Sequence, residues 1–274
     1  MTDKKAELPN PSTLSILIAV ILLAYTLINF ISIPSTQIDF SLLGIIFPLK
    51  INFSTLVAVL VLGLTASGTA WLLQENRASN QYQNTIVHWL LPSLTAMVLL
   101  LILQQIPFSG IWWIAAFGSG LLLLLVFTAE YCVLDLENQY YQLAEIGISG
   151  LSLAFFLILA VGLHAAEIRL FLRVPVLSTA GLLIFLRVIH LRQEGKWAYI
   201  HGSAVFFLVG ELAAGLHYLP LDSVSFGIAL VGLLYAFIEL SDRILESDAP
   251  LKTEIFITPG IVLVSFWLVA FAVL

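Results

Sequence analysis

The chain has 274 residues, of which 60% are hydrophobic and only 10% are charged. Ordinary globular proteins contain about 45–50% apolar and about 25% charged residues, so this composition cannot form a fold surrounded by water. The formal net charge is −6 and no basic patch is present, so nucleic acid is not an expected partner. We therefore expect an integral protein of a lipid bilayer, in the plasma membrane of a bacterial cell.

Nine apolar runs follow one another along the chain. Runs of about 17–25 residues are long enough to cross a hydrocarbon core of about 30 Å as a helix. A backbone in lipid must satisfy its own hydrogen bonds, and an α-helix does so within one segment. The sequence thus predicts an all-α, polytopic membrane helical bundle, with eight or ten helices as the alternatives to nine. The predicted spans are 13–33, 52–74, 86–106, 110–131, 143–164, 171–191, 198–218, 222–242 and 255–274.

The segments outside these spans are short. Residues 1–12 form a predicted cytoplasmic tail, and the span that follows is interpreted as an uncleaved signal anchor because no A-x-A cleavage pattern follows it. The connection 34–51 contains an apolar stretch that is too short to span and is interrupted by Pro48, which favours an interfacial or re-entrant segment. Residues 13–274 are expected to form a single transmembrane domain.

The basic residues predict the orientation, because Lys and Arg gather on the cytoplasmic side of membrane proteins. With the N-terminus in the cytoplasm, most of the 11 basic residues fall on that side, and Lys50, Arg169 and Arg173 fall on the other. The predicted cytoplasmic connection between the fourth and fifth spans is an exception, since it holds no basic residue. The pattern as a whole predicts an N-in, C-out topology.

Glu211 is the most unusual residue within a predicted span. It lies in FFLVGELAAGLHYL, residues 206–219, about 20 Å from the cytoplasmic end of its helix at about 1.5 Å per residue. An acid in this position is a functional-site hypothesis by default, and desolvation favours its protonated form. Gly210 and Ala214 form a small-xxx-small pair that lets another helix approach, so we expect Glu211 to face the bundle. It would then be either a structural hydrogen-bonding group or the proton-relay site of a transporter.

Three polar residues are candidate partners of Glu211. Arg173 lies near the outer end of the sixth span, from which its long side chain can reach inward. Asn29 and Gln104 lie in the outer parts of the first and third spans and can donate hydrogen bonds. His217 is a weaker candidate, because it lies about 120° away from Glu211 around the helix.

A second group of polar residues is expected at the cytoplasmic ends of three spans. The stretch ELSDRILE, residues 239–246, places three carboxylates on one helix face, with Arg243 four residues after Glu239. Such a face is either an ion-paired, solvated surface or a site that holds Mg²⁺ with a diphosphate substrate. The members of the group are Glu130, Arg187, Glu239, Asp242, Arg243 and Glu246.

Several other kinds of chemistry lack the residues they need. The five histidines show no HExxH motif and no pair at ligand spacing, so no metal site is expected. The lone Cys132 cannot form an internal disulfide and is interpreted as a packing residue. The connections after the second and sixth spans lack the aspartate-rich motifs of membrane prenyltransferases. No phosphate-binding loop or dinucleotide fingerprint is present, so no cofactor is expected.

Three functions are consistent with these residues. The favoured one is a non-enzymatic structural or accessory membrane protein whose polar residues pack helices. The first alternative is a proton-coupled transporter of a small molecule, with Glu211 as the protonatable site. The second is a membrane enzyme that acts on a phosphorylated, lipid-like substrate at the cytoplasmic face. A membrane protein partner or a second copy of the chain fits any of them.

Overall fold

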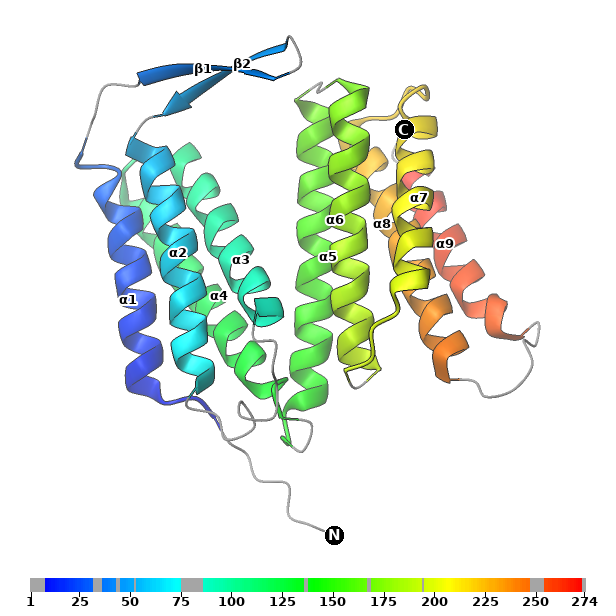
Figure 1. Ribbon diagram of the computed structural model, residues 1–274, viewed down its shortest axis with the longest axis horizontal. Helices are drawn as coiled ribbons and strands as arrows, with labels where there is room; N and C mark the ends of the chain where they lie inside the picture. The colour runs from blue at the N-terminus through cyan, green and yellow to red at the C-terminus, as the bar shows by residue number, and fades with distance from the viewer. Residues whose placement is uncertain are drawn as a thin grey trace. The chain divides into compact units, whose positions relative to one another are not determined.

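The computed structural model describes residues 8–31, 36–42, 45–51, 53–74, 86–135, 138–166, 169–193, 195–246 and 254–272. Within these ranges the chain forms nine α-helices and one β-hairpin (Figure 1). The helices are α1 (Pro11–Leu27), α2 (Phe53–Gln74), α3 (Ile86–Gln105), α4 (Gly110–Cys132), α5 (Tyr141–Ala165), α6 (Leu170–Arg192), α7 (Tyr199–Leu216), α8 (Ser223–Glu246) and α9 (Glu254–Ala272). The predicted all-α membrane bundle is confirmed, and its orientation stays a prediction.

Among the described residues, eight helices, α2 to α9, are long and apolar enough to cross a membrane. The remaining helix, α1, has 17 residues and begins where Asn10 accepts the N–H of Ser12 at 3.1 Å. The first predicted span, 13–33, is wrong at its carboxyl end, because residues 28–30 form a turn. Asn29, a poor helix former, lies in that turn.

The connection between α1 and α2 contains a β-hairpin. Strand β1 (Thr36–Leu42) pairs antiparallel with β2 (Ile45–Ile51), so that Phe40 lies opposite Phe47. Polar and apolar residues alternate from Gln37 to Leu42, which is the period of a strand. The predicted interfacial or re-entrant segment therefore has an extended backbone that the sequence prediction did not include.

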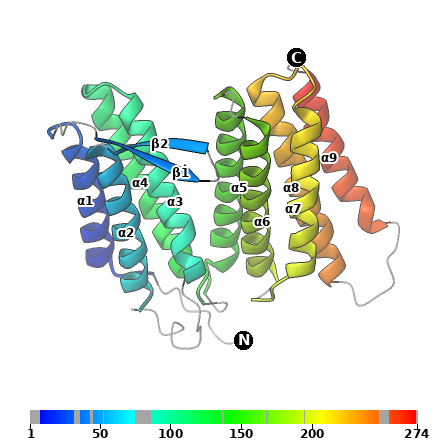
Figure 2. The same ribbon diagram turned by 45° about the horizontal axis from the view of Figure 1, so that its top comes forward.

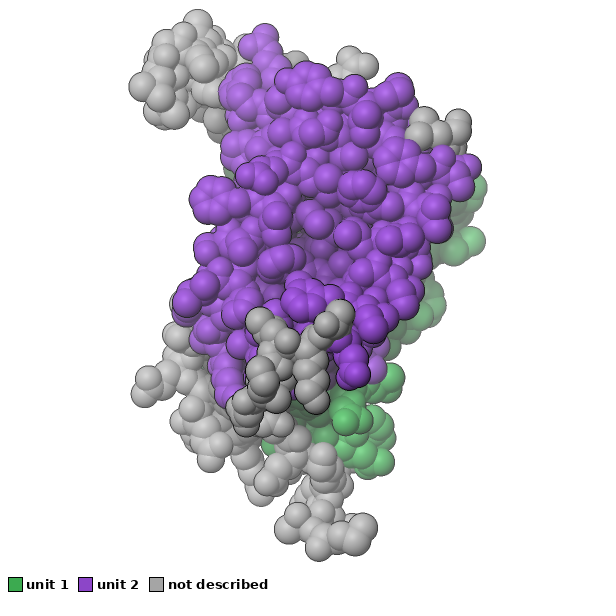
Figure 3. Space-filling view, turned by 90° about the vertical axis from the view of Figure 1, so that its right-hand side faces the viewer, with its two compact units in different colours: residues 1–144 green, residues 145–274 purple. Residues whose placement is uncertain are grey.

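The chain divides into two compact units, residues 1–144 and 145–274 (Figure 3). Unit 1 contains α1 to α4, and its core includes the fully buried side chains of Tyr25 and Trp112. The Tyr25 hydroxyl donates a hydrogen bond of 2.6 Å to the carbonyl oxygen of Ala96, which joins α1 to α3. This contact satisfies the one polar group that Tyr25 brings into the core.

Unit 2 contains α5 from Glu145 onward and helices α6 to α9. Helices α6 and α7 lie side by side, as do α8 and α9 (Figures 1 and 2). Glycines allow these close approaches, because a Cβ atom at Gly232 of α8 would collide with Cβ of Phe266 in α9. At Gly210 of α7 an added Cβ would lie 2.6 Å from Oγ of Ser178 in α6, so the predicted close approach at Gly210 is confirmed.

Candidate functional site

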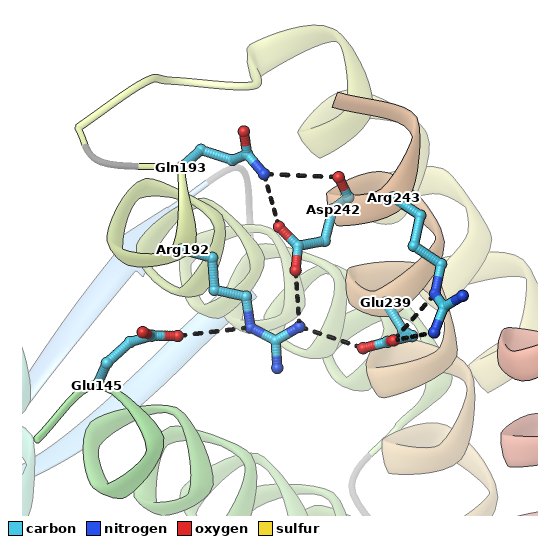
Figure 4. Close-up of polar contacts among 6 residues, drawn as sticks. All are labelled: Glu145, Arg192, Gln193, Glu239, Asp242 and Arg243. Atoms are coloured by element: carbon cyan, nitrogen blue, oxygen red, sulfur yellow. Dashed lines mark hydrogen bonds and ion pairs between the residues drawn. The ribbon is translucent and has the colours of Figure 1, made fainter. Parts of the chain in front are cut away.

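One end of unit 2 carries a network of charged and polar side chains, here called the Arg192 network (Figure 4). It joins the start of α5, the end of α6 and the last turns of α8. Its members are Glu145, Arg192, Gln193, Glu239, Asp242 and Arg243.

Arg192 is the centre of this network. Its Nη1 donates to Oε2 of Glu239 at 3.2 Å and to Oδ2 of Asp242 at 3.1 Å, while its Nε lies 3.9 Å from Oε1 of Glu145. All four side chains are 20% exposed, so they are largely withdrawn from solvent. One guanidinium thus links three helices, as a planar group with several donors is suited to do.

The two α8 carboxylates have additional donors. Gln193 donates from Nε2 to Oδ1 of Asp242 at 2.7 Å. Arg243 donates from Nε and Nη2 to Oε1 of Glu239 at 3.1 and 3.0 Å, which is the i, i+4 pair that the spacing predicted. Both oxygens of Asp242 and both oxygens of Glu239 therefore accept a hydrogen bond within the network.

The predicted cytoplasmic group is only partly assembled by the structure. Glu239, Asp242 and Arg243 lie together, but the arginine that pairs with both acids is Arg192. Glu246 is exposed and makes no hydrogen bond or ion pair with any described residue. Across the described ranges, no three His, Cys, Asp or Glu side chains are grouped so that they could hold a metal ion.

Glu130 and Arg187 belong to different units. In unit 1, Glu130 of α4 is fully buried, and its Oε2 lies 2.8 Å from Nδ1 of His88 in α3. In unit 2, Arg187 of α6 is 4% exposed. Their predicted grouping with the α8 carboxylates stays a prediction.

Glu211 lies on the exposed surface of α7, so the prediction that it faces the bundle is wrong. The buried face of α7 carries Val205, Val209 and Ala213, which lie roughly opposite Glu211 at about 100° per residue. Gly215, on the same side as Glu211, has nothing within 4 Å of an added Cβ. The contact between α7 and α6 is therefore made by small residues on the flank of α7 that does not carry Glu211.

Arg173, the predicted partner that lies in the same unit as Glu211, makes no hydrogen bond or ion pair with it. Arg173 instead donates from Nη1 to Nδ1 of His217 at 3.1 Å. Asn29 and Gln104 are exposed residues of unit 1, and their relation to Glu211 stays a prediction. Over the described part of the chain, Glu211 makes no hydrogen bond or ion pair.

The other end of unit 2 holds what we call the Arg173 cluster, made of His164, Arg173, His217 and Phe226. Arg173 is 3% exposed, and its Cζ lies 5.7 Å from the ring centroid of Phe226. The His164 ring stacks on the same phenyl ring, with centroids 4.4 Å apart and planes at 19°. Cation–π contact and stacking thus gather two basic side chains on one buried aromatic ring.

Asp222 is an acid at the same end, and it caps α8. Its Oδ1 accepts the N–H of Ser225 at 3.0 Å, and its Oδ2 accepts the N–H of Val224 at 3.3 Å. The hydroxyl and the backbone N–H of Ser225 stabilise the ionised carboxylate and lower the pKa of Asp222. The carboxylate is fully exposed and directed to its own helix.

Sequence reasoning missed three members of the Arg192 network and the contact between Arg173 and His217. Arg192 and Gln193 come directly after the predicted sixth span, 171–191, and Glu145 lies near the start of the predicted fifth, 143–164. Their place at span ends was a signal, because consecutive antiparallel helices bring such ends together. For His217, the sequence predicted at most a weak contact with Glu211 of the same helix.

Comparison with known proteins identifies a family and no function. No curated protein and no solved structure matches the chain. A family model described as "Protein of unknown function (DUF5656)" matches residues 33–273, from before the β-hairpin to the last described helix. The chain is therefore a multi-pass integral membrane protein that belongs to the DUF5656 family.

Proposed function

We propose that this protein is a non-catalytic, structural or accessory component of its membrane, in which polar side chains hold the helices in a fixed arrangement. The observation that carries the proposal is that every carboxylate oxygen of Glu239 and Asp242 accepts a hydrogen bond within the Arg192 network. Its two arginines and Gln193 donate to both oxygens of Glu239 and of Asp242. These acids are thus engaged with the protein's own donors.

A network of this kind favours one arrangement of helices over others. Charges that are largely withdrawn from water are costly unless their partners are in place, so any shift of α5 or α8 relative to α6 is penalised. Polar groups are also known to link helices within membranes. The same carboxylates in a catalytic site would need free oxygen atoms for a metal or a substrate.

The thermal unfolding of the full chain in detergent tests this proposal. Asp242→Asn should lower the unfolding temperature, because a neutral amide cannot replace the carboxylate between Arg192 and Gln193. Glu246→Gln is the matched control, since it removes a negative charge from an exposed position on the same helix. This control should unfold at the wild-type temperature.

The same assay separates the structural role from the enzyme alternative. If the carboxylates served catalysis, Mg²⁺ together with a diphosphate lipid would raise the unfolding temperature of the wild type. Asp242→Asn would abolish that rise and would itself cost little stability. Such a result would contradict the proposal, whereas we expect no rise with Mg²⁺ and a clear loss of stability in the variant.

A further inference from the structure

The Arg173 cluster contains a deeply buried cation that forms no ion pair with any acid among the described residues. Arg173 is 3% exposed, and its only hydrogen bond within the described chain goes to His217. Its Nε is buried and has no hydrogen-bond partner among those residues. A buried guanidinium without a counter-ion is costly, so a negatively charged partner would stabilise this arrangement.

The position of Arg173 on its helix adds to that cost. Arg173 is the fourth residue of α6, within the first turn, where the helix dipole is positive. Cations are disfavoured there and anions are favoured, because the first backbone N–H groups point outward along the helix axis. A structural arginine would be better placed at the opposite end of α6, which is where Arg192 lies.

The neighbouring side chains also present nitrogen atoms. Nδ1 of His217 accepts from Arg173, so that ring carries its remaining proton on Nε2. Nδ1 of His164 is buried and has no hydrogen-bond partner among the described residues. Arg173, His217 and Asp222 all lie within electrostatic range of His164. Asp222 is exposed and engaged with the first N–H groups of α8, so it is not in an ion pair with Arg173.

We infer that the Arg173 cluster is a binding site for a phosphate group, with Arg173 as the main ligand and His164 and His217 as additional donors. Guanidinium groups match the geometry of oxyanions, and imidazole nitrogens can supply further hydrogen bonds when protonated. His217 is exposed, so the cluster is reached from the surface of unit 2. The exposed side chain of Tyr218 follows it, and tyrosine is typical of a membrane–water interface.

The phosphate group can come from a phospholipid head group or from the free ion, and two arms of one experiment distinguish these sources. In the first arm, the full chain in a non-ionic detergent is titrated with inorganic phosphate, against chloride at equal ionic strength. In the second arm, phosphatidylglycerol is added to the same micelles, and lipid that is retained on the protein is measured by native mass spectrometry. The variants are Arg173→Gln and, as a matched control, Arg169→Gln at an exposed position beside the same helix start.

We expect ligand binding to raise the unfolding temperature of the wild type by about 2–4 °C in at least one arm. Arg173→Gln should lose that rise and weaken binding at least about tenfold, while Arg169→Gln should keep both. A rise with phosphatidylglycerol alone identifies a lipid head group, and a rise with inorganic phosphate identifies the free ion. If neither probe stabilises the wild type, or if both stabilise Arg173→Gln equally well, the inference is wrong. If Arg173→Gln does not fold, Arg173→Met replaces it in both arms, and wild-type affinity in that variant overturns the inference.

Discussion

Arg192 and Arg173 lie near opposite ends of the same helix, α6, and their guanidinium groups have different surroundings. Arg192 is 20% exposed and is approached by carboxylates from α5 and α8. Arg173 is 3% exposed and contacts an imidazole and a phenyl ring. The positive charge of Arg192 is balanced by acidic residues of the same chain. The positive charge of Arg173 would be balanced by a bound anion.

This difference separates two roles that a charged residue can have in a membrane protein. A matched network fixes the helices, and its members cannot also bind another group without losing their own partners. An unmatched cation destabilises the isolated chain and gains that free energy back when it binds an anion. The two arginines should therefore respond differently to the same substitution.

The largest effect is expected for Arg192→Met. This change leaves Glu239 and Asp242 without their shared cation while keeping most of the side-chain volume. Removing one partner of a buried ion pair costs about 3–5 kcal/mol, and partial exposure reduces the expected loss here to about 2–3 kcal/mol of unfolding free energy. Denaturant unfolding in detergent measures it. As a control, Arg243→Met, whose side chain is 38% exposed, should cost about 0.5 kcal/mol. Equal losses in the two variants would mean that Arg192 is not the centre of the network.

A steric change on α8 shows how much helix contact contributes apart from charge. Gly232→Ala adds a methyl group that collides with Cβ of Phe266, an atom that rotation of the phenylalanine side chain cannot move away. We expect a loss of about 1–2 kcal/mol, because α9 must shift away from α8. Thermal unfolding measures the loss.

Gly215→Ala is the matched control for this steric effect. Gly215 is a helical glycine with nothing within 4 Å of an added Cβ, so the alanine should raise stability slightly through its better helix propensity. A wild-type unfolding temperature for Gly232→Ala would show that the contact between α8 and α9 is loose.

The sequence predicted most of the fold because lipid allows few alternatives. A long apolar run in a bilayer must be a helix, so the membrane bundle followed from composition and run length. The exception, β1 and β2, lies outside the apolar spans, where that constraint is weaker. Its alternation from Gln37 to Leu42 was readable, but Pro48 and the apolar residues around it favoured another interpretation.

The side-chain partners were harder to predict, because periodicity within one helix does not determine which face packs against its neighbours. The pair of Glu239 and Arg243 was predictable, since both residues belong to α8. Their link to Arg192 depends on how α6 lies against α8, and the exposed position of Glu211 depends on which flank of α7 meets α6. Small residues occur on both flanks of α7, so the sequence did not distinguish them.

Arg173→Met should not cause the loss of stability that is expected for Arg192→Met. In phosphate-free detergent the substitution replaces a buried, unmatched cation by an apolar side chain of similar length. We expect the free energy of unfolding to stay the same or to rise by no more than about 1 kcal/mol, since the lost cation–π contact offsets part of the gain. A loss as large as that of Arg192→Met would show that Arg173 has a stabilising partner. The arginines at the two ends of α6 would then not differ in charge balance.

The smallest effect is expected at Asp222, and it tests whether this acid acts on Arg173 or only on its own helix. Its pKa is lowered by the hydroxyl and backbone N–H of Ser225, so its contribution to stability is fully present above the unfolded pKa of about 3.9. That contribution is lost as the pH falls through the lower, folded-state pKa. The neutral cap in Asp222→Asn has no such pH dependence. The advantage of the wild type over Asp222→Asn should therefore be constant near neutral pH and should shrink in acid.

Thermal unfolding of both proteins between about pH 6 and pH 3 provides this difference curve. The comparison is repeated in the Arg173→Met background. If Asp222 acts only as a helix cap, the curve is the same in both backgrounds, because its oxygens are held by the N–H groups of Val224 and Ser225. If Asp222 also balances the charge of Arg173, its advantage becomes smaller once the arginine is removed. That second outcome would mean that Asp222 balances part of the positive charge of Arg173. Arg173 would then resemble Arg192 in having an acidic partner within the chain.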